Sequence, residues 1–189
     1  MTVTPEMIGS FVKVFTAEVN LSGDLKYSIQ LMIDKADKEG VAKIKAMIEK
    51  AKAKGKETKW GGKVPKFRYE PLRDGDAELE SGEKEDACYK GRYFINASCA
   101  GDEKDPAPQV VGPTGTPLMD QHELYSGCVV RADVSAFPYK NGGNNGIGWY
   151  LNSIMKVRDG VRLDGKVDAV DAFKDYVVEE EVEADTDLS

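Results

Sequence analysis

The sequence has little from which a catalytic centre could be built. Its 189 residues contain one histidine, His122, and three cysteines that form no C-x-x-C pair. No Asp or Cys lies at a triad or zinc-ligand spacing from His122. An odd number of unpaired cysteines is typical of reduced, packed thiols. We therefore expect no catalytic residues, no metal site and no cofactor.

Nucleotide-binding loops are also lacking. Gly61-Gly62-Lys63 is followed by valine instead of Ser or Thr, and Glu57 stands where a Walker A loop needs its first glycine. The run GGNNGIG (142–148) does not fit G-x-G-x-x-G, and it joins two strand-like segments. A hairpin turn explains this run better than a phosphate-binding loop.

Long apolar runs are missing as well. No segment approaches the roughly 18–20 apolar residues that span a bilayer. The first residues, MTVTPEMIGSFVKVF, lack the basic-then-apolar order of a signal peptide. We expect a protein with no membrane partner and no transmembrane segment.

Charge is abundant but unevenly distributed along the chain. The net charge is −7, yet residues 168–189 hold nine carboxylates against one lysine. Residues 50–68 hold eight cations and only Glu57 as an acid. The chain thus combines a basic band with an acidic tail, and a nucleic-acid partner is compatible with this distribution.

The order of hydrophobic patterns predicts a mainly β fold. Strands are expected over 10–20, 25–33, 64–69, 91–98, 126–139 and 147–160, with loops over 77–86 and 101–117. Val41, Ile44, Ile48 and Ala51 fall at helical spacing, which predicts one helix over 34–54 with Gly55 as its C-terminal glycine. A short amphipathic helix over 168–178 is also expected. This order suits a five-stranded OB-fold barrel with one helix between early strands and long loops.

Two of these strands are expected to carry a binding face. In 126–139, Val130, Ala132 and Val134 share a small apolar face, opposite Arg131, Phe137 and Tyr139. In 147–160, alternation places Trp149 and Leu151 on one face, and the opposite face carries Tyr150, Asn152, Ile154, Lys156 and Arg158.

Aromatic and cationic side chains without a catalyst among them favour single-stranded nucleic acid as the partner. Rings stack on bases, and cations contact the phosphates. The predicted DNA-binding residues are Lys59, Trp60, Lys63, Lys66, Phe67, Arg68, Tyr69, Arg131, Phe137, Tyr139, Lys140, Tyr150, Lys156 and Arg158. Any one of these rings also suits a core position, so the prediction concerns the set.

The acidic tail (179–189) is expected to be disordered, because it has no apolar area to bury. Its carboxylates are Glu179, Glu180, Glu181, Glu183, Asp185 and Asp187. Such a tail can occupy a basic groove in place of DNA or dock replication and recombination proteins, and it can also serve solubility alone.

Several segments together resemble a phage family of single-stranded-DNA-binding proteins with an OB fold, long catalogued as a domain of unknown function. They are KWGGKVP (59–65), PLRDGD (71–76), GRYFINAS (91–98), LYSGCVVRADVSAF (124–137), NNGIGWYLNSIMKVRDG (144–160) and LDG (163–165). The resemblance implies ssDNA binding in phage replication and recombination in the cytoplasm of the bacterial host, without catalysis. Many related tails end in an aromatic residue, whereas this one ends Asp187-Leu188-Ser189.

The residues leave a second function open. A protein–protein adaptor would bind basic partners through the acidic tail and the acidic segment 77–86, with the fold as scaffold. In both cases we expect one domain over 1–178 followed by the acidic tail, and a homo-oligomer is compatible with either.

Overall fold

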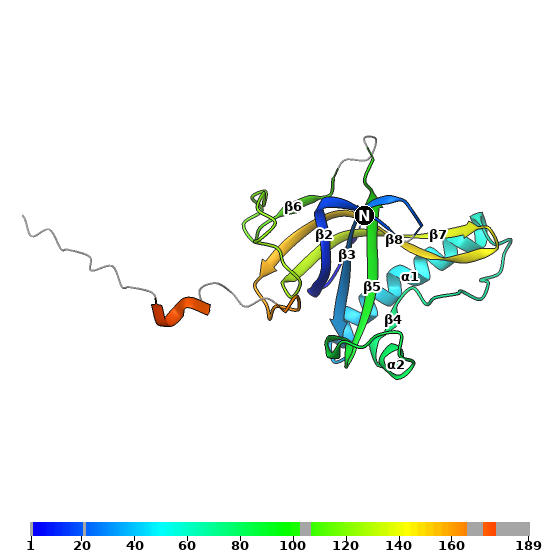
Figure 1. The fold of residues 1–189 in the computed structure, drawn as a ribbon. Coiled ribbons are helices and arrows are strands. Elements are labelled where there is room, and N and C mark those ends of the chain that lie inside the picture. Colours follow the sequence, from blue (N-terminus) through cyan, green and yellow to red (C-terminus); the bar gives the residue numbers. More distant parts are fainter. Residues whose placement is uncertain (1, 21, 103–106, 166–171, 177–189) are drawn as a thin grey trace, which may run out of the picture.

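The computed structural model describes residues 2–20, 22–102, 107–165 and 172–176. The described part is mainly β (Figure 1). Its strands are β1 (Thr2–Val3), β2 (Met7–Val19), β3 (Leu25–Asp34), β4 (Arg73–Asp74), β5 (Arg92–Ala100), β6 (Gln109–Val111), β7 (Val129–Asn141) and β8 (Asn144–Arg158). Its helices are α1 (Lys38–Thr58), α2 (Gly75–Glu80) and the 3-10 turns η1 (Ala87–Tyr89) and η2 (Lys174–Tyr176). The mainly β composition is as predicted.

Five strands are paired in a closed circuit. β2, β3, β5, β8 and β7 are neighbours in that order, and β7 pairs in turn with β2. All of these pairings are antiparallel except β5 with β8, which is parallel. The short strands β1, β4 and β6 add to β7, β5 and β8.

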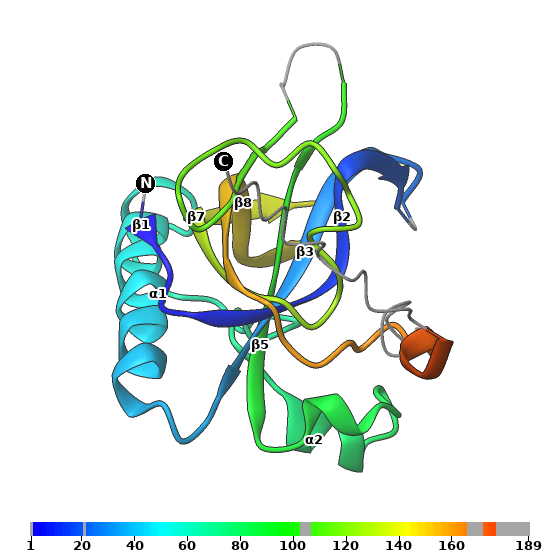
Figure 2. The same ribbon diagram turned by 90° about the vertical axis from the view of Figure 1, so that its left-hand side faces the viewer.

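The helix α1 follows from its apolar spacing and its cap. Asp37 accepts a hydrogen bond from the backbone N–H of Gly40, and Val41, Ile44, Ile48 and Ala51 are buried. The helix packs against β7 and also touches β3 and β8. Figure 2 shows α1 running beside β1 at one side of the strands, with α2 below β5.

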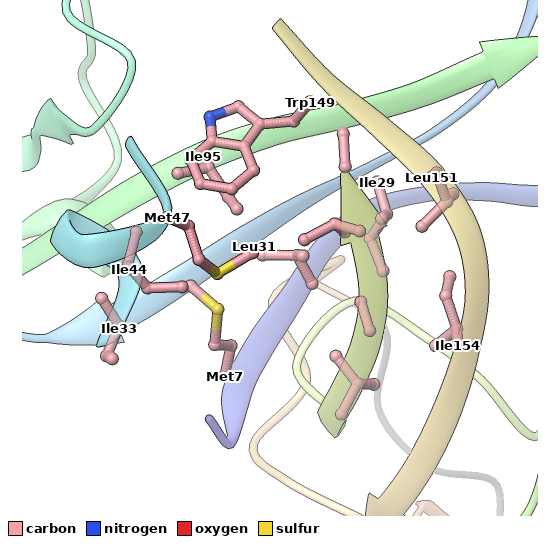
Figure 3. Packing of buried hydrophobic residues seen from close by; sticks show 14 of the residues in the cluster. Met7, Ile29, Leu31, Ile33, Ile44, Met47, Ile95, Trp149, Leu151 and Ile154 are labelled. Carbon is pink, nitrogen blue, oxygen red and sulfur yellow. The ribbon is translucent and has the colours of Figure 1, made fainter. Parts of the chain in front are cut away.

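The core lies between the paired strands and α1. Leu31 from β3, Ile95 from β5 and Leu151 from β8 are almost completely buried and join Ile44 and Met47 of α1 in one cluster (Figure 3). The alternation predicted for β7 is confirmed, because Val130, Ala132 and Val134 are fully buried. The remaining face of this sheet is therefore free to carry polar and aromatic side chains.

The longest hairpin joins β7 to β8 through a two-residue turn. Asn141 pairs with Asn144, and Gly142 and Gly143 between them have φ angles of 54° and 85°. Two consecutive positive φ angles suit glycine and match the twist of a hairpin. The predicted hairpin is confirmed, with a tighter turn than the sequence suggested.

Gly55 was expected to end α1, but the helix continues to Thr58 and Gly55 is buried inside it. A Cβ at Gly55 would lie only 2.3 Å from a ring carbon of Trp60. The glycine therefore makes room for the indole and does not terminate the helix.

Two predictions in the α1–β5 connection are wrong. Residues 64–69 form no strand, and part of the expected loop 77–86 is the helix α2. Asp74 caps α2 by accepting from the N–H of Asp76 and Ala77, while Arg73 pairs with Glu78. Local capping thus organises an acidic segment that shows no periodicity.

The alternation predicted for β8 fails at a β-bulge. Asp133 pairs with Ser153 and Val134 with Leu151, so Asn152 has no partner across the ladder. The bulge shifts the alternation by one residue, and Ile154, expected on the outer face, is buried in the core. Lys156, which was also expected on the outer face, pairs with the buried Val130 for the same reason.

Two further expectations fall wholly or largely on residues that are not described. The acidic tail 179–189 lies outside the described residues, as does most of the expected helix 168–178, of which η2 is seen. In the part of the chain that is described, no helix is long and apolar enough to cross a membrane.

Candidate nucleic-acid interface

Two aromatic rings lie across the outer face of the β7–β8 hairpin. Phe137 is paired with Gly148 and Tyr139 with Gly146. A Cβ at either glycine would fall 2.5 Å from an atom of the opposite aromatic side chain, so both rings rest directly on glycine backbone. Phe137 remains 42% exposed. An exposed ring held against a flat strand surface is the geometry that base stacking requires.

Trp60 links this hairpin to the end of α1. Its indole Nε1–H donates a 3.2 Å hydrogen bond to the backbone carbonyl of Tyr139, and its ring packs on Gly55. The ring centroid of Phe67 lies 5.4 Å away at an interplanar angle of 54°. Trp60 and Phe67 are both half-buried, so they fix the position of the connection more than they offer free faces. Figure 1 shows the end of α1 beside the hairpin tip.

The basic band is thereby brought to the hairpin tip. Among the described residues, no carboxylate lies within 4 Å of the exposed ammonium groups of Lys59, Lys63, Lys66 and Lys140. Unpaired exposed cations attract phosphates without first giving up an internal ion pair. We call Trp60, Phe137, Tyr139 and these four lysines the tip patch.

Arg68 and Tyr69 lie farther along the same connection. Tyr69 is exposed, and the guanidinium carbons of Arg68 and Arg73 lie 5.3 and 5.2 Å from its ring centroid. These cation–π contacts orient the ring without covering it.

Three predicted cations lie away from the tip. Arg131 and Arg158 both contact Glu6, at 3.3 and 2.5 Å, at the end of the hairpin opposite its turn. The hydrogen bond from Arg158 is the main reason that the pKa of Glu6 lies below its usual value. Lys156 is 13% exposed and contacts Asp159 and the carbonyl of Glu123. The structure therefore does not bring these three cations together with the tip patch.

Tyr150 lies between the two groups. It pairs with Ser135 on β7 and with Ser98 on β5, and it is half-buried. Since paired residues share one face of a sheet, Tyr150 connects the hairpin face with the outer face of β5 and β3.

The side chains that could bind a metal ion or act as a nucleophile do not cluster in the described part of the chain. No cluster of three or more His, Cys, Asp or Glu side chains that could hold a metal ion occurs within the described ranges. His122 is exposed in a loop. Burial, with the nearby Asp86, raises the pKa of Cys88 to about 11, which keeps this thiol protonated.

Comparison with known proteins decides the family. The family model described as "Enterobacter phage Enc34, ssDNA-binding protein" matches residues 2–185. The chain belongs to the Enc34 ssDNA-binding protein family. The resemblance noted in the sequence is thus confirmed.

This Enc34-family chain is also similar to a phage protein in sequence and to solved structures in fold. Protein p50 of Acyrthosiphon pisum secondary endosymbiont phage 1 is 30% identical over 177 residues, which is 88% of each chain. The solved ssDNA-binding protein of bacteriophage Enc34 is 22% identical, with a TM-score of 0.68 over 90% of this chain and 88% of that one. The same protein in complex with ssDNA gives a TM-score of 0.70 at 22% identity over 85% and 88%. The single-stranded DNA binding protein gp2.5 of bacteriophage T7 gives 0.59 at 17% over 88% and 96%.

Several residues of the Enc34-family chain were missed by sequence reasoning. Gly146 and Gly148 alternate at period two opposite Tyr139 and Phe137, a signal that is readable once the hairpin is aligned. Phe11 is a different case, because it stands on the outer face only through a local backbone irregularity. Nothing in its sequence neighbourhood marks it.

Proposed function

We propose that this chain is a non-catalytic, largely sequence-independent single-stranded-DNA-binding protein of phage replication and recombination. The observation that carries the proposal is the tip patch, where exposed or half-exposed rings and unpaired lysines meet. Family membership and the likeness to the Enc34 protein and to T7 gp2.5, both named as ssDNA-binding proteins, support it.

The fold is, on this proposal, a five-stranded OB-fold barrel. The closed circuit β2–β3–β5–β8–β7, with β5 and β8 parallel, has the strand order of that Greek-key barrel. OB-folds bind oligonucleotides on the face of their second and third strands and through the loops beside it. Here those strands are β3 and β5, and the β7–β8 turn is one of the neighbouring loops.

Binding at the tip patch follows from two terms. Each base stacked on a ring is worth about 1–3 kcal/mol, and stacking tolerates any base because every base has a π-face. Each lysine that neutralises a phosphate releases counterions and adds salt-dependent affinity. Neither contribution reads base edges, so this part of the surface binds with little sequence preference.

The other predicted residues fall into two groups. The proposed surface extends to Phe67, Arg68, Tyr69 and Tyr150. The cations that would join it only after leaving their present partners are Arg131, Lys156 and Arg158.

The acidic tail is proposed to compete with DNA. Six carboxylates lie between Glu179 and Asp187 and match the charge, though not the bases, of a short DNA strand. The basic band at residues 50–68 offers the complementary surface within the same molecule. Displacement of the tail by DNA would also expose it to other replication or recombination proteins.

A binding assay with a matched control tests the proposal. Fluorescence anisotropy of a labelled oligo-dT is measured for the wild type, for Phe137→Ala with Tyr139→Ala, and for Met119→Ala, which removes an 86% exposed apolar side chain from a loop. We expect the double variant to lose at least tenfold in affinity and Met119→Ala to bind like the wild type. Equal affinity of all three proteins would refute stacking at the tip patch. No binding of the wild type at micromolar protein would refute the function and favour an adaptor that acts through its acidic segments.

A further inference from the structure

Phe11 has the one positive φ, 47°, among the non-glycine residues in the described part of the chain. A bulky side chain in the left-handed region is a genuine outlier. The irregularity lies within β2, where the pairing with β3 shifts between Ser10 and Lys13. Its ring is 58% exposed, so the strained backbone is not compensated by burial of the side chain. Strain that holds an apolar ring in solvent indicates a binding role.

The ring forms one wall of a pocket on the outer face of β3 and β5. The pocket has a volume of about 280 Å³ and is lined by Phe11, Ser28, Ile29, Gln30, Lys84 and Asn96. This volume is slightly below the roughly 300–1,000 Å³ of drug-sized ligand sites. The pocket is therefore sized for a small planar group and not for a large ligand.

A chain of hydrogen bonds orients the polar wall of this pocket. The buried hydroxyl of Tyr89 donates to Oε1 of Gln30 at 2.8 Å, and Nε2 of Gln30 donates to Oδ1 of Asn96 at 2.9 Å. Because Oδ1 of Asn96 accepts this bond, its Nδ2 group presents two N–H donors at the exposed surface. The pocket thus offers donors to an acceptor edge, next to an aromatic face.

Lys84 supplies the charge at this site. Its ammonium lies 5.9 Å from the ring centroid of Phe11, 5.1 Å from that of Tyr89 and 5.8 Å from that of Phe94. No carboxylate of the described residues lies within 4 Å of it. A cation placed by aromatic rings and not by a carboxylate remains available for an anion.

We propose that this pocket is a nucleotide subsite, which rests on the proposed function. One base of the bound strand stacks on Phe11, its acceptor edge receives an N–H of Asn96, and an adjacent phosphate contacts Lys84. The subsite shares no residue with the tip patch, because its lining comes from β2, β3, β5 and Lys84, whereas the tip patch lies on β7 and on the segment that follows α1. The paired residues Ser28, Ser98, Tyr150 and Ser135 mark a row across these strands that a bound strand can follow.

Phe11→Gly is the decisive variant. Glycine adopts a positive φ readily, so removal of the ring should leave the melting temperature unchanged or raise it. Affinity for oligo-dT should fall about 5- to 150-fold, the range expected for one lost stacking contact. Phe11→Leu keeps apolar volume without a π-face and should lose affinity similarly. A lower melting temperature for Phe11→Gly with unchanged affinity would make Phe11 a structural residue and overturn the subsite.

Two further experiments test which part of the nucleotide each residue of the subsite contacts. Asn96→Asp keeps an acceptor for Gln30 but replaces the donors with a carboxylate. It should weaken oligo-dT binding more than Thr114→Asp, which adds the same charge to the exposed segment 113–117. On a deoxyribose-phosphate oligomer without bases, Phe11→Gly and the wild type should bind equally. A persisting difference there would overturn base stacking. Failure of the wild type to bind oligo-dT would refute the proposed function, whereas tight wild-type binding with unaffected variants would refute the subsite alone.

Discussion

The indole N–H of Trp60 donates to the backbone carbonyl of Tyr139, 79 residues further along the chain. This hydrogen bond ties the end of α1 to β7 close to the hairpin turn. It places the basic band of residues 50–68 next to Phe137 and Tyr139, so that cations from one segment and aromatic rings from the other lie at the same surface. The site therefore depends on a tertiary contact whose geometry is set by the space above Gly55.

Gly55→Ala should destabilise the protein, although the same change in an exposed helix stabilises by up to about 1 kcal/mol. The new Cβ would lie 2.3–2.6 Å from three ring carbons of Trp60 and force the indole away. We expect a loss of about 1–3 kcal/mol in the free energy of unfolding, measured by urea denaturation, with weaker oligo-dT binding. Ala53→Gly, on the exposed side of α1, should cost about 1 kcal/mol without affecting DNA. A stabilised Gly55→Ala protein would contradict this account of Trp60.

Gly148→Ala should affect binding much more than stability. Its Cβ would meet the Phe137 ring at 2.5 Å, but that ring is partly exposed and can turn away. We expect at least a fivefold loss of oligo-dT affinity in an anisotropy titration, with a change in unfolding free energy below about 1 kcal/mol. Gly112→Ala is the matched control, because its Cβ would meet Leu118 at an ordinary 3.5 Å. Equal oligo-dT affinities of Gly148→Ala and Gly112→Ala would contradict base stacking on the Phe137 ring.

Stability should fall in acid partly through Lys35. Its ammonium contacts Asp74 at 2.5 Å and Asp76 at 2.7 Å. Burial opposes ionisation of Asp74, but the hydrogen bonds from Lys35 and from backbone N–H groups leave its pKa below the usual value. For Asp76, the hydrogen bond from Lys35 is the largest cause of a lowered pKa, followed by the N–H of Gly91.

A lowered carboxyl pKa stabilises the fold above the unfolded value of about 3.9, and this contribution disappears as the pH falls through the folded pKa. Lys35→Met should therefore lose stability at pH 7 and show a shallower decline of melting temperature below about pH 4. Lys43→Met, which removes an exposed lysine of α1, should retain the wild-type profile. If the melting temperatures of the wild type and Lys35→Met fall in parallel as the pH is lowered, the ion pairs of Lys35 with Asp74 and Asp76 do not contribute to the acid sensitivity.

Deletion of residues 179–189 should tighten ssDNA binding if the tail competes for the basic band. The gain should be largest at low salt, where screening of the intramolecular attraction is weakest, and should shrink near 1 M salt. Replacing the six tail carboxylates by their amides keeps the length and should give the same gain. Unchanged affinity of both variants at all salt concentrations would leave the tail with a solubility role only.

Elements with strong periodicity could be predicted from the sequence. The i, i+3, i+4 spacing in α1 and the alternation in β7 each reflect one buried face, and both were correct. The β7–β8 hairpin followed from its glycine-rich turn. The composition of residues 64–69 predicts a strand, but the structure has an irregular connection there, in which Phe67 packs against Trp60.

The parts that could not be predicted depend on single-residue irregularities. The bulge at Asn152 moved Ile154 into the core and Lys156 away from Tyr150, and no residue type announces such a bulge. The left-handed backbone at Phe11 is equally invisible in sequence. Pairing of Arg131 and Arg158 with Glu6 depends on contacts between residues more than 120 positions apart. Charge composition therefore indicated the partner class but overstated how many cations share one surface.

The most direct test of the central claim is a salt-dependent titration of Trp60 fluorescence with oligo-dT. Trp60 and Trp149 are the two tryptophans of the chain, so Trp149→Phe leaves Trp60 as the reporter in the tip patch. We expect saturable quenching. A plot of log affinity against log salt concentration should be linear, with a slope of about −0.7 for each phosphate neutralised. Lys63→Gln or Lys140→Gln should reduce that slope by about 0.7, whereas Arg158→Gln should leave it unchanged. Saturable binding that ignores salt, or the absence of Trp60 quenching at saturating DNA, would contradict a DNA-binding tip patch.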